Sequence, residues 1–417
     1  MKKLLSFVGA LFSPLFSIIL LVCSSAPFMT FITVRMKEQG FNDATVSYIH
    51  SAFYAGYLLG SARVEKLIRR IGFIRSFAVF GALYCASVTI QGLYFNTILW
   101  ILCRFIGGFC VSALYIIISS WLLVQSTPQT RGKILSLYMI AIYASQSFSQ
   151  LFLNIINPLS LAEFLFAALL GSISIIPVAF TYYQTPEPQR PGPRKKIAEM
   201  YKEAPLAFIG SLTAGLILSS IYSFVPNYAH FVKISVPLIM MITLAGGFVL
   251  QWPIGLISDK LDRRKILIIT SFTVLIPAIL IIFLSAYTEA IYILSFILGG
   301  LTFTIYPLSI THMCDKIEPI YITYATSILS LTYGIGSVIG PLISGQVMEY
   351  ISPSALYLYI AGVAGILAIL GIYYKIKRPI STPSLEKSEY IPLAGGAPSS
   401  ELDPRTQEES EKEEDQE

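Results

Sequence analysis

The residues best suited to chemistry stand close together between two apolar stretches, where Gly255 precedes Asp259, and Arg263 and Arg264 follow. A carboxylate near arginines forms charge-assisted hydrogen bonds with them, and it can also face a helix N-terminus. Because such bonds can be made and broken, the cluster is suited to be a releasable lock on a gate. The alternative is that Lys260 and the two arginines only anchor the loop. We expect gating residues here.

Arg104 is the second candidate, because it lies well inside an apolar run. An arginine stays charged, so it needs an anionic or carbonyl partner. The sequence places no carboxylate inside a span of the same half. We therefore expect Arg104 to face a central cavity, held by backbone, Gln or Tyr acceptors, and to contact a substrate with a carboxylate or other acceptor group. The alternative is a structural arginine bound to carbonyl groups of the first span.

A polar stripe follows a short distance later. Tyr143, Ser147, Gln150 and Asn154 have the 4, 3, 4 spacing of one helix face, with Gln146 beside them. These side chains either line a path or hydrogen-bond to neighbouring helices. Similar candidates elsewhere are Ser24, Ser25, Thr332 and the predicted binding residues Tyr222, Asn227, Tyr306 and Tyr333.

Other kinds of chemistry have no motif in this sequence. Walker A, G-x-S-x-G and HExxH motifs are absent, and no His or Cys cluster has metal-ligand spacing. His50, His230 and His312 lie near the ends of predicted spans, as does Glu163, so we expect them at interfaces rather than in a proton relay. We therefore predict no enzymatic activity, no cofactor and no metal. The coupling ion stays open.

Long apolar runs position these residues. The chain is 55% hydrophobic and 13% charged, with a mean hydropathy of +0.69. Only helices and closed barrels satisfy their backbone inside a bilayer, and roughly 20 apolar residues suffice for a helix to cross it. We predict an all-α membrane protein with about twelve transmembrane helices, the first of them an uncleaved span. The predicted spans are 10–34, 46–64, 73–92, 97–124, 132–156, 162–183, 206–230, 235–258, 265–286, 289–313, 321–348 and 353–375.

Charge is distributed unevenly along the chain. Residues 380–417 carry 11 acidic and 3 basic residues, whereas residues 1–379 carry 26 basic and 13 acidic ones. The basic residues fill alternate gaps between spans, which by the positive-inside rule places both termini in the cytoplasm. The basic excess favours contact with anionic lipid headgroups, not nucleic acid. The tail has little to bury, so we expect disorder there.

The two halves of the chain repeat each other. The segment 105–108 recurs as 296–300, and Tyr115 recurs as Tyr306, 191 positions later. The four residues ILSL also occur in both halves, 194 positions apart. Such repeats imply two bundles in the same orientation with a site at their interface near the bilayer midplane. We predict an N-terminal six-helix bundle at 1–183, a cytoplasmic linker with a short interfacial helix at 184–205, a C-terminal six-helix bundle at 206–379 and the acidic tail at 380–417.

The cluster around Asp259 resembles the loop motif G-x-x-x-D-R-x-G-R-R of the major facilitator superfamily. The equivalent loop of the first half is degenerate, because Arg70 and Gly72 fit but Arg69 stands where the acid is expected. We include Arg70 among the gating residues.

Two further motifs carry the resemblance inside spans. Arg104 matches the R-x-x-x-G pattern of span four, and Gly336, Gly340 and Pro341 are similar to a G-x-x-x-G-P pattern that usually lies in span five of antiporters. Here the second pattern lies in span eleven, so it does not by itself indicate antiport. Small residues let backbones pack closely and proline bends a helix. We therefore expect Gly340 and Pro341 to belong to the gate.

Residues 15–375 resemble the YcaD-like branch of the superfamily more closely. The segments that carry this resemblance include 251–255, 303–307 and 314–318. One departure is Ser119, which stands where that branch can carry a glutamate. The resemblance implies two pseudo-symmetric six-helix bundles, with no assigned substrate.

We therefore predict a monomeric secondary transporter, active or facilitative, in a bacterial cell inner membrane. Its two halves move a small organic solute by alternating access. The alternatives are a non-transporting sensor on the same scaffold, with the tail as its output, and a membrane-embedded enzyme.

Overall fold

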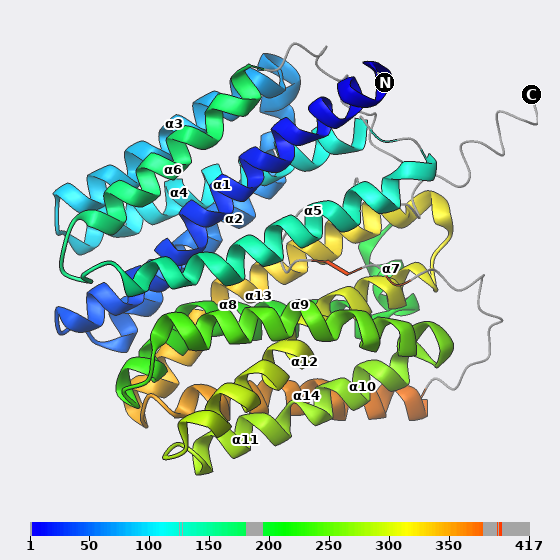
Figure 1. Cartoon of the computed structure of the whole chain (residues 1–417). Coiled ribbons are helices and arrows are strands. Elements are labelled where there is room, and N and C mark those ends of the chain that lie inside the picture. The colour runs from blue at the N-terminus through cyan, green and yellow to red at the C-terminus, as the bar shows by residue number, and fades with distance from the viewer. Residues whose placement is uncertain are drawn as a thin grey trace, which may run out of the picture. The chain divides into compact units, whose positions relative to one another are not determined.

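The structure is a computed structural model that describes residues 2–124, 126, 128–180, 195–377, 390, 392 and 393. Within these residues the chain forms helices and turns and no strand. The described residues divide into two compact units, one from residues 2–180 and one from residues 195–393 (Figure 1).

The N-terminal unit is built from six long helices and one short 3-10 helix within its described residues. They are α1 (Lys2–Glu38), α2 (Asp43–Ile71), α3 (Phe73–Leu93), α4 (Thr97–Val124), α5 (Pro128–Ser149), η1 (Gln150–Asn154) and α6 (Ala162–Ala179).

The C-terminal unit starts with a short helix in the predicted linker, of which residues 184–194 lie outside the described part of the chain. Its elements are α7 (Ile197–Glu203), α8 (Pro205–Phe231), α9 (Val236–Lys260), α10 (Arg263–Thr273), α11 (Leu275–Phe283), α12 (Thr288–Cys314), η2 (Pro319–Tyr321), α13 (Ile322–Tyr350) and α14 (Ala355–Lys377). Of the predicted tail, the structure describes only Tyr390, Pro392 and Leu393.

The described helices include ten spans that are long and apolar enough to cross a membrane, and α10 and α11 together form one of them. Two more helices, α2 with 29 residues and α5 with 22 residues, have the same length range but are more polar. With these two, the described residues contain twelve helical segments long enough to cross a membrane, six in each unit. The predicted all-α membrane fold is confirmed.

Two predicted spans differ from the observed helices. The predicted span 132–156 stops as an α-helix at Ser149, and a 3-10 turn continues it. The predicted span 265–286 is interrupted at Val274, between α10 and α11. Pro277 explains the interruption, because it has no N–H to donate to the carbonyl of Thr273 four residues earlier.

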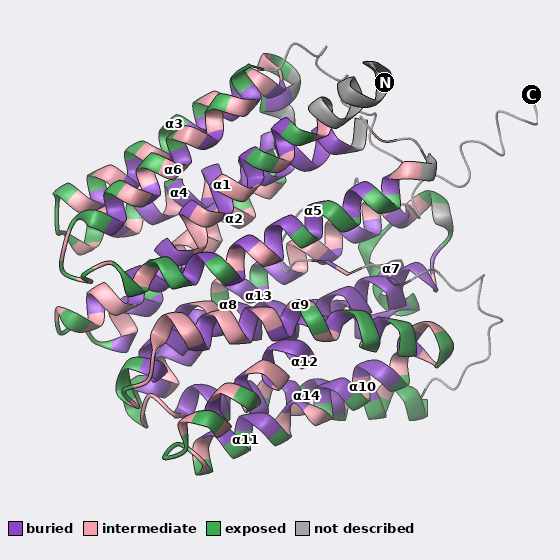
Figure 2. Ribbon diagram, in the orientation of Figure 1, coloured by how far each residue is buried: buried purple, intermediate pink, exposed green. Residues whose placement is uncertain are grey.

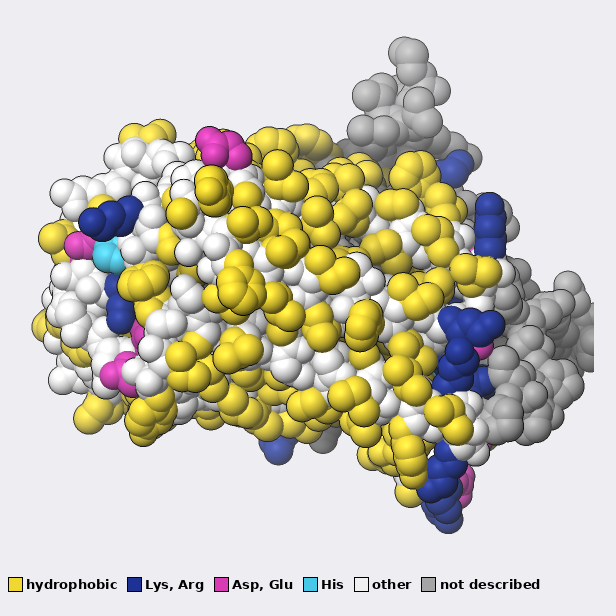
Figure 3. Space-filling view, turned by 90° about the horizontal axis from the view of Figure 1, so that it is seen from below, with side chains coloured by type: hydrophobic (Ala, Val, Ile, Leu, Met, Phe, Trp, Pro, Cys, Tyr) yellow, Lys and Arg dark blue, Asp and Glu magenta, His cyan; other side chains and the backbone are white. Residues whose placement is uncertain are grey.

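The surface suits a lipid environment. Along the helices, buried and exposed residues form separate stripes (Figure 2). Many exposed side chains are large and apolar, such as Phe283 and Ile376, which are 78% and 76% exposed. On the face drawn in Figure 3, apolar side chains cover the middle, and Lys and Arg lie toward both ends, with more of them at one end. Because polar backbone groups are paired inside the helices, such a belt can face hydrocarbon.

Equivalent glycines confirm that the two units are repeats. A side chain on Gly56 of α2 would overlap the carbonyl oxygen of Phe105 in α4. A side chain on Gly246 of α9 would overlap the carbonyl oxygen of Phe296 in α12. The two phenylalanines are 191 positions apart, as are Tyr115 and Tyr306. The same close backbone contact between helices therefore occurs in both units.

Candidate functional site

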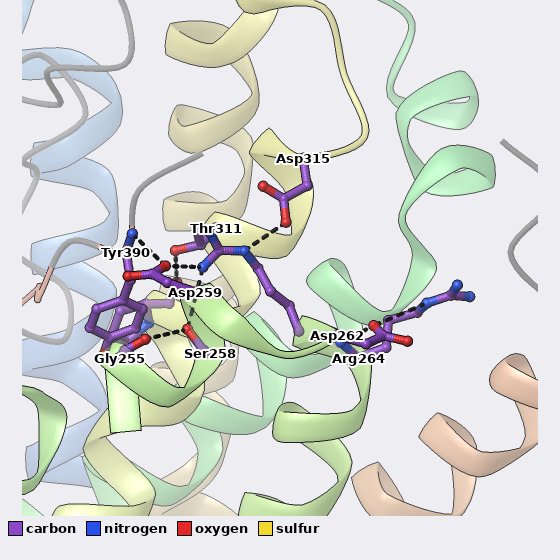
Figure 4. A network of polar contacts seen from close by, with 10 residues as sticks. Gly255, Ser258, Asp259, Asp262, Arg264, Thr311, Asp315 and Tyr390 are labelled. Carbon is purple, nitrogen blue, oxygen red and sulfur yellow. Dashed lines mark hydrogen bonds and ion pairs between the residues drawn. The ribbon is translucent and has the colours of Figure 1, made fainter. Parts of the chain in front are cut away.

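Asp259, Arg263 and Asp315 form an ion-pair network where α9 ends and α10 begins (Figure 4). Arg263 Nη1 lies 3.1 Å from Asp259 Oδ1, and Arg263 Nε lies 2.6 Å from Asp315 Oδ2. Arg263 Nη1 also donates to Ser258 Oγ at 3.3 Å. The Arg263 side chain is 2% exposed. One buried guanidinium therefore connects the end of α9 to the end of α12.

The local sequence explains the position of Arg263. Asp262 is the N-cap of α10, and its Oδ1 accepts a hydrogen bond from the backbone N–H of Arg264 at 3.0 Å. This cap makes Arg263 the first residue of the new helix, within reach of Asp259 on the preceding turn. Arg264, the other predicted gating arginine, has its Nε 3.9 Å from Asp262 Oδ1.

Sequence analysis missed two members of this network. Asp315 directly follows α12 as its C-cap. Tyr390 belongs to the tail, and its backbone N–H donates to Asp259 Oδ1 at 3.0 Å. A signal existed for each, because Asp315 stands beside Lys316 at a span end and Tyr390 begins the longest apolar stretch of the tail.

The other predicted gating residues lie apart from this network. Arg70 is exposed, next to the last residue of α2. Gly340 and Pro341 are buried in α13, where a side chain on Gly340 would overlap Ser219 Oγ of α8. These two residues therefore support close packing of α13 on α8. Whether they belong to the gate stays a prediction.

Arg104 is buried in the N-terminal unit among apolar side chains. Its Nη2 donates to Met29 Sδ, and its Cζ lies 4.4 Å from the ring centroid of Phe53 and 5.7 Å from that of Phe28. Its Nε has no hydrogen-bond partner among the described residues. The predicted backbone, Gln or Tyr acceptors are wrong, and the first-span contact is a thioether and not a carbonyl. Aromatic faces attract the charge but leave donor capacity unused.

The N-terminal unit also buries a carboxylate, which corrects the prediction for Glu163. Its side chain, at the second position of α6, is fully buried. Neither carboxylate oxygen has a hydrogen-bond partner in the described part of the chain. On the same helix face, Ala167 O accepts from Ser24 Oγ of α1 at 2.6 Å. The first turn of α6 thus packs inside the unit, and its place at the start of a span did not reveal this.

Two of the three histidines also depart from the predicted interfacial position. His50 is fully buried and its Nε2 lies 2.7 Å from Thr33 Oγ1 of α1. It interacts electrostatically with Arg104. His312, in the last turn of α12, is 4% exposed, whereas His230 in the last turn of α8 is exposed. Neighbouring helices cover the first two, which a single-helix pattern cannot show.

The predicted polar stripe of the fifth span is divided by the change of helix type. Gln150 is fully buried, and its Oε1 accepts from Thr30 Oγ1 of α1 at 2.8 Å. Gln146 is half-buried and hydrogen-bonds the side chain of Tyr115. Asn154 is exposed, because a 3-10 helix turns more per residue and moves it off the stripe. Gln150 therefore links helices within the unit.

Three of the predicted binding residues of the C-terminal unit are tyrosines with aromatic contacts, and with Phe303 we call them the aromatic group. Tyr306 and Tyr333 have ring centroids 4.8 Å apart, and Tyr306 Oη lies 2.8 Å from Ser330 Oγ. Tyr222 contacts Phe303, one turn before Tyr306 in α12, with centroids 5.9 Å apart. Asn227, also in α8, is 2% exposed. The structure thus brings together Tyr306 and Tyr333, two of the residues that the sequence singled out.

Comparisons with known proteins agree with this architecture. The Major Facilitator Superfamily model matches residues 14–319 and 232–403. The MFS-type transporter YcaD of Escherichia coli O45:K1 is 26% identical over 358 residues, covering 85% of this chain and 92% of YcaD. YcaD of Shigella flexneri serotype 5b is equally similar over 357 residues.

Solved structures show the same fold. The nucleoside transporter NupG superposes with a TM-score of 0.74 at 15% identity, over 87% of this chain and 98% of NupG. A bacterial homologue of the human lysosomal transporter Spinster, inward-facing and unoccupied, has a TM-score of 0.67 at 13% identity, over 96% of this chain and 97% of that one. With its twelve helices, repeated units and matching loop motif, the chain belongs to the major facilitator superfamily.

Proposed function

We propose that this protein is a secondary transporter, active or facilitative, that moves a small organic solute by alternating access of its two six-helix units. The observation that carries the proposal is the guanidinium of Arg104, which keeps an unused donor inside a membrane-spanning unit. An ionisable side chain at that depth is costly and is usually functional. Membership of a transporter superfamily supports the same conclusion.

The solute would carry a carboxylate or another strong acceptor. The planar guanidinium of Arg104 offers several donors in one plane, which suits such groups. The rings of Phe53 and Phe28 hold the guanidinium without occupying those donors. Nucleosides, named for NupG, also present carbonyl acceptors and belong among the compounds to be tested.

The network of Asp259, Arg263 and Asp315 would serve as the lock of one gate. Its hydrogen bonds join the ends of α9 and α12, so they can hold in one conformation and break in another. Arg264, Arg70, Gly340 and Pro341 are the further gating residues of this proposal. The further binding residues of this proposal are, in the N-terminal unit, Gln146 and Gln150 and, in the C-terminal unit, Tyr222, Asn227, Tyr306 and Tyr333.

We place the protein in the bacterial cell inner membrane as a monomer, with both termini and the linker in the cytoplasm. The basic residues at the end of α9, the start of α10 and the end of α14 support this orientation through the positive-inside rule. Reporter fusions after Lys196 and after Lys377, active only in the periplasm, should both be silent. Activity of either fusion would overturn the orientation.

The transport proposal is tested with purified protein in proteoliposomes. A library of carboxylates, nucleosides and other small metabolites is screened for thermal stabilisation and then for uptake. We expect a stabilising solute with an acceptor group, and Arg104→Lys should weaken its binding about tenfold because the planar fork is lost. Arg35→Lys is the matched control, because Arg35 lies in the last turn of α1 and donates to Pro158 O.

The outcomes separate the proposed roles. Normal binding and uptake by both Arg104→Lys and Arg104→Gln would remove Arg104 from the binding site. Binding without uptake would favour a sensor on the same scaffold, for which the contact between Tyr390 and Asp259 supplies a route from the gate to the tail.

A further inference from the structure

Part of the acidic tail binds the C-terminal unit. We call Tyr390, Pro392 and Leu393, the tail residues that the structure describes, the tail anchor. Tyr390 is 7% exposed and Leu393 is 3% exposed. The expected lack of packed structure in the tail therefore does not extend to these residues. Burial of two large apolar side chains at a helix surface stabilises the contact by hydrophobic transfer.

The anchor lies against one face of α9. Gln251, Gly255 and Asp259 follow each other at intervals of four, so they share that face. Asp259 Oδ1 accepts from the backbone N–H of Tyr390 at 3.0 Å. Gln251 Nε2 donates to the carbonyl oxygen of Leu393 at 3.5 Å. Two side chains of α9 thus bind backbone groups at the first and the last residue of the anchor.

The lengths of the two segments agree. Eight helical residues, from 251 to 259, span about 12 Å along α9. The chain from 390 to 393 can span at most about 10 Å. Tyr390 is paired with the end of α9 and Leu393 with the earlier position. The anchor therefore runs antiparallel to α9.

Gly255 makes room for the tyrosine. A side chain on Gly255 would overlap the ring of Tyr390. The ring therefore packs directly against α9 at a position where only glycine leaves enough space (Figure 4). Leu393 reaches the level of Gln251, whose Nε2 also donates to Phe303 O at 3.4 Å. Phe303 in turn contacts Tyr222 of the aromatic group. The anchor thus connects the proposed gate with the level of the proposed binding residues.

We propose that the face of α9 formed by Gln251, Gly255 and Asp259 is a binding site for the chain's own tail anchor, and that the bound anchor inhibits the gate. Asp259 Oδ1 accepts from Tyr390 and pairs with Arg263 at the same time. The anchor therefore favours the conformation in which the lock is closed, and its release precedes opening. The binding is independent of the proposed transport function, whereas the inhibition rests on it.

Binding is tested first, without any solute. Leu393→Cys in the full-length protein is reacted with a water-soluble maleimide, and labelling of the parent with its five native cysteines is subtracted. We expect labelling to be slower than after denaturation by about tenfold, because reaction requires local release of the anchor. Adding Tyr390→Ala should raise the labelling rate about fivefold. Leu385→Ala, which shortens a different side chain of the tail, should leave the labelling rate unchanged. Equal rates in folded and denatured protein would contradict the binding site.

A second measurement covers the case in which the cysteine itself weakens the anchor. Hydrogen exchange of a peptide that contains Tyr390 is compared between the parent and Gly255→Ala. We expect slow exchange in the parent, because the Tyr390 amide is bonded to Asp259, and fast exchange when the added methyl group displaces the ring. Fast exchange in both proteins would contradict the binding site.

Inhibition is tested by uptake of the solute found in the metabolite screen. Tyr390→Ala should raise the initial uptake rate about threefold, while Leu385→Ala should match the parent. Faster labelling with unchanged uptake would contradict inhibition and leave the binding site intact. Absence of uptake in parent and variants alike would instead contradict the proposed transport function, so the two failures are distinguishable.

Discussion

The buried charged side chains of the two units differ in their bonding partners. In the C-terminal unit, Arg263 is bonded to the carboxylates of both Asp259 and Asp315. In the N-terminal unit, the Nε of Arg104 and both carboxylate oxygens of Glu163 have no hydrogen-bond partner among the described residues. The two units are repeats of one fold, so the difference lies in the side chains and not in the scaffold.

This difference favours different proposed tasks for the two sites. The carboxylates bonded to a buried guanidinium offset its desolvation cost, and removal of one of them is strongly destabilising, which suits a lock between helix ends. A buried charge without a partner carries a desolvation cost that a ligand or a proton can relieve. We therefore associate the C-terminal network with conformational control and the N-terminal side chains with binding.

The largest effect is expected from Asp315→Asn. Removing one charge from the buried pair with Arg263 should lower the free energy of unfolding by about 3 kcal/mol, because the guanidinium then keeps only the more exposed Asp259. Thermal unfolding in detergent measures the change, with the exposed Glu318→Gln as the control. An unchanged unfolding midpoint would mean that the ion pair between Arg263 and Asp315 does not stabilise the fold. That result would contradict the proposed difference between the two units.

Asp259→Asn should affect turnover more than folding. The amide keeps the volume of the carboxylate but loses charge-assisted hydrogen bonds worth about 1.5–3 kcal/mol. A bias of that size shifts a two-state equilibrium about tenfold away from the locked conformation. Because alternating access must also pass through that conformation, uptake should fall by a similar factor while solute binding persists. Tyr390→Ala, in contrast, leaves the pair between Asp259 and Arg263 in place. Initial uptake rates and binding are compared with those of Lys260→Gln. Parental uptake by Asp259→Asn would reduce this residue to an anchor of the loop.

Glu163→Gln should not lower the free energy of unfolding, in contrast to Asp315→Asn. Because the carboxylate of Glu163 has no hydrogen-bond partner among the described residues, the variant should have the same free energy of unfolding as the parent, or one up to about 2 kcal/mol higher. The exposed Glu289→Gln is the matched control in the other unit. A loss of stability comparable to that of Asp315→Asn would show that Glu163 is paired, which would remove the contrast between the units.

The smallest effect is expected at the surface of α7. Glu203 Oε1 lies 2.7 Å from Lys195 Nζ, and this contact raises the pKa of Lys195. A raised lysine pKa stabilises the fold below the unfolded value and loses its contribution as pH rises through the folded one. Since the pair is partly exposed, Glu203→Gln should cost at most about 0.5 kcal/mol at neutral pH, measured by thermal unfolding. A larger loss would show that surface pairs contribute as much as the buried network.

Local patterns in the sequence were sufficient for the helices and for the motif around Asp259. The length of an apolar run predicts a membrane-spanning helix, because in a bilayer the backbone N–H and C=O groups of a helix are hydrogen-bonded within that one segment. The division of the predicted ninth span at Val274 was also present in the sequence as Pro277, which removes a specific hydrogen bond. The 191-residue offset between Tyr115 and Tyr306 likewise indicated the repeat before any contact was known.

Only the tertiary structure showed which residues far apart in the sequence form ion pairs and hydrogen bonds with each other. Arg263 with Asp315, and Asp259 with Tyr390, are separated by 52 and 131 residues, and no local pattern links them. The burial of Glu163 and His50 also depends on which helices cover them, and both lie near the ends of their helices, where the sequence alone suggests exposure. A single segment determines its own helix, whereas the environment of a charge is determined by every segment packed around it.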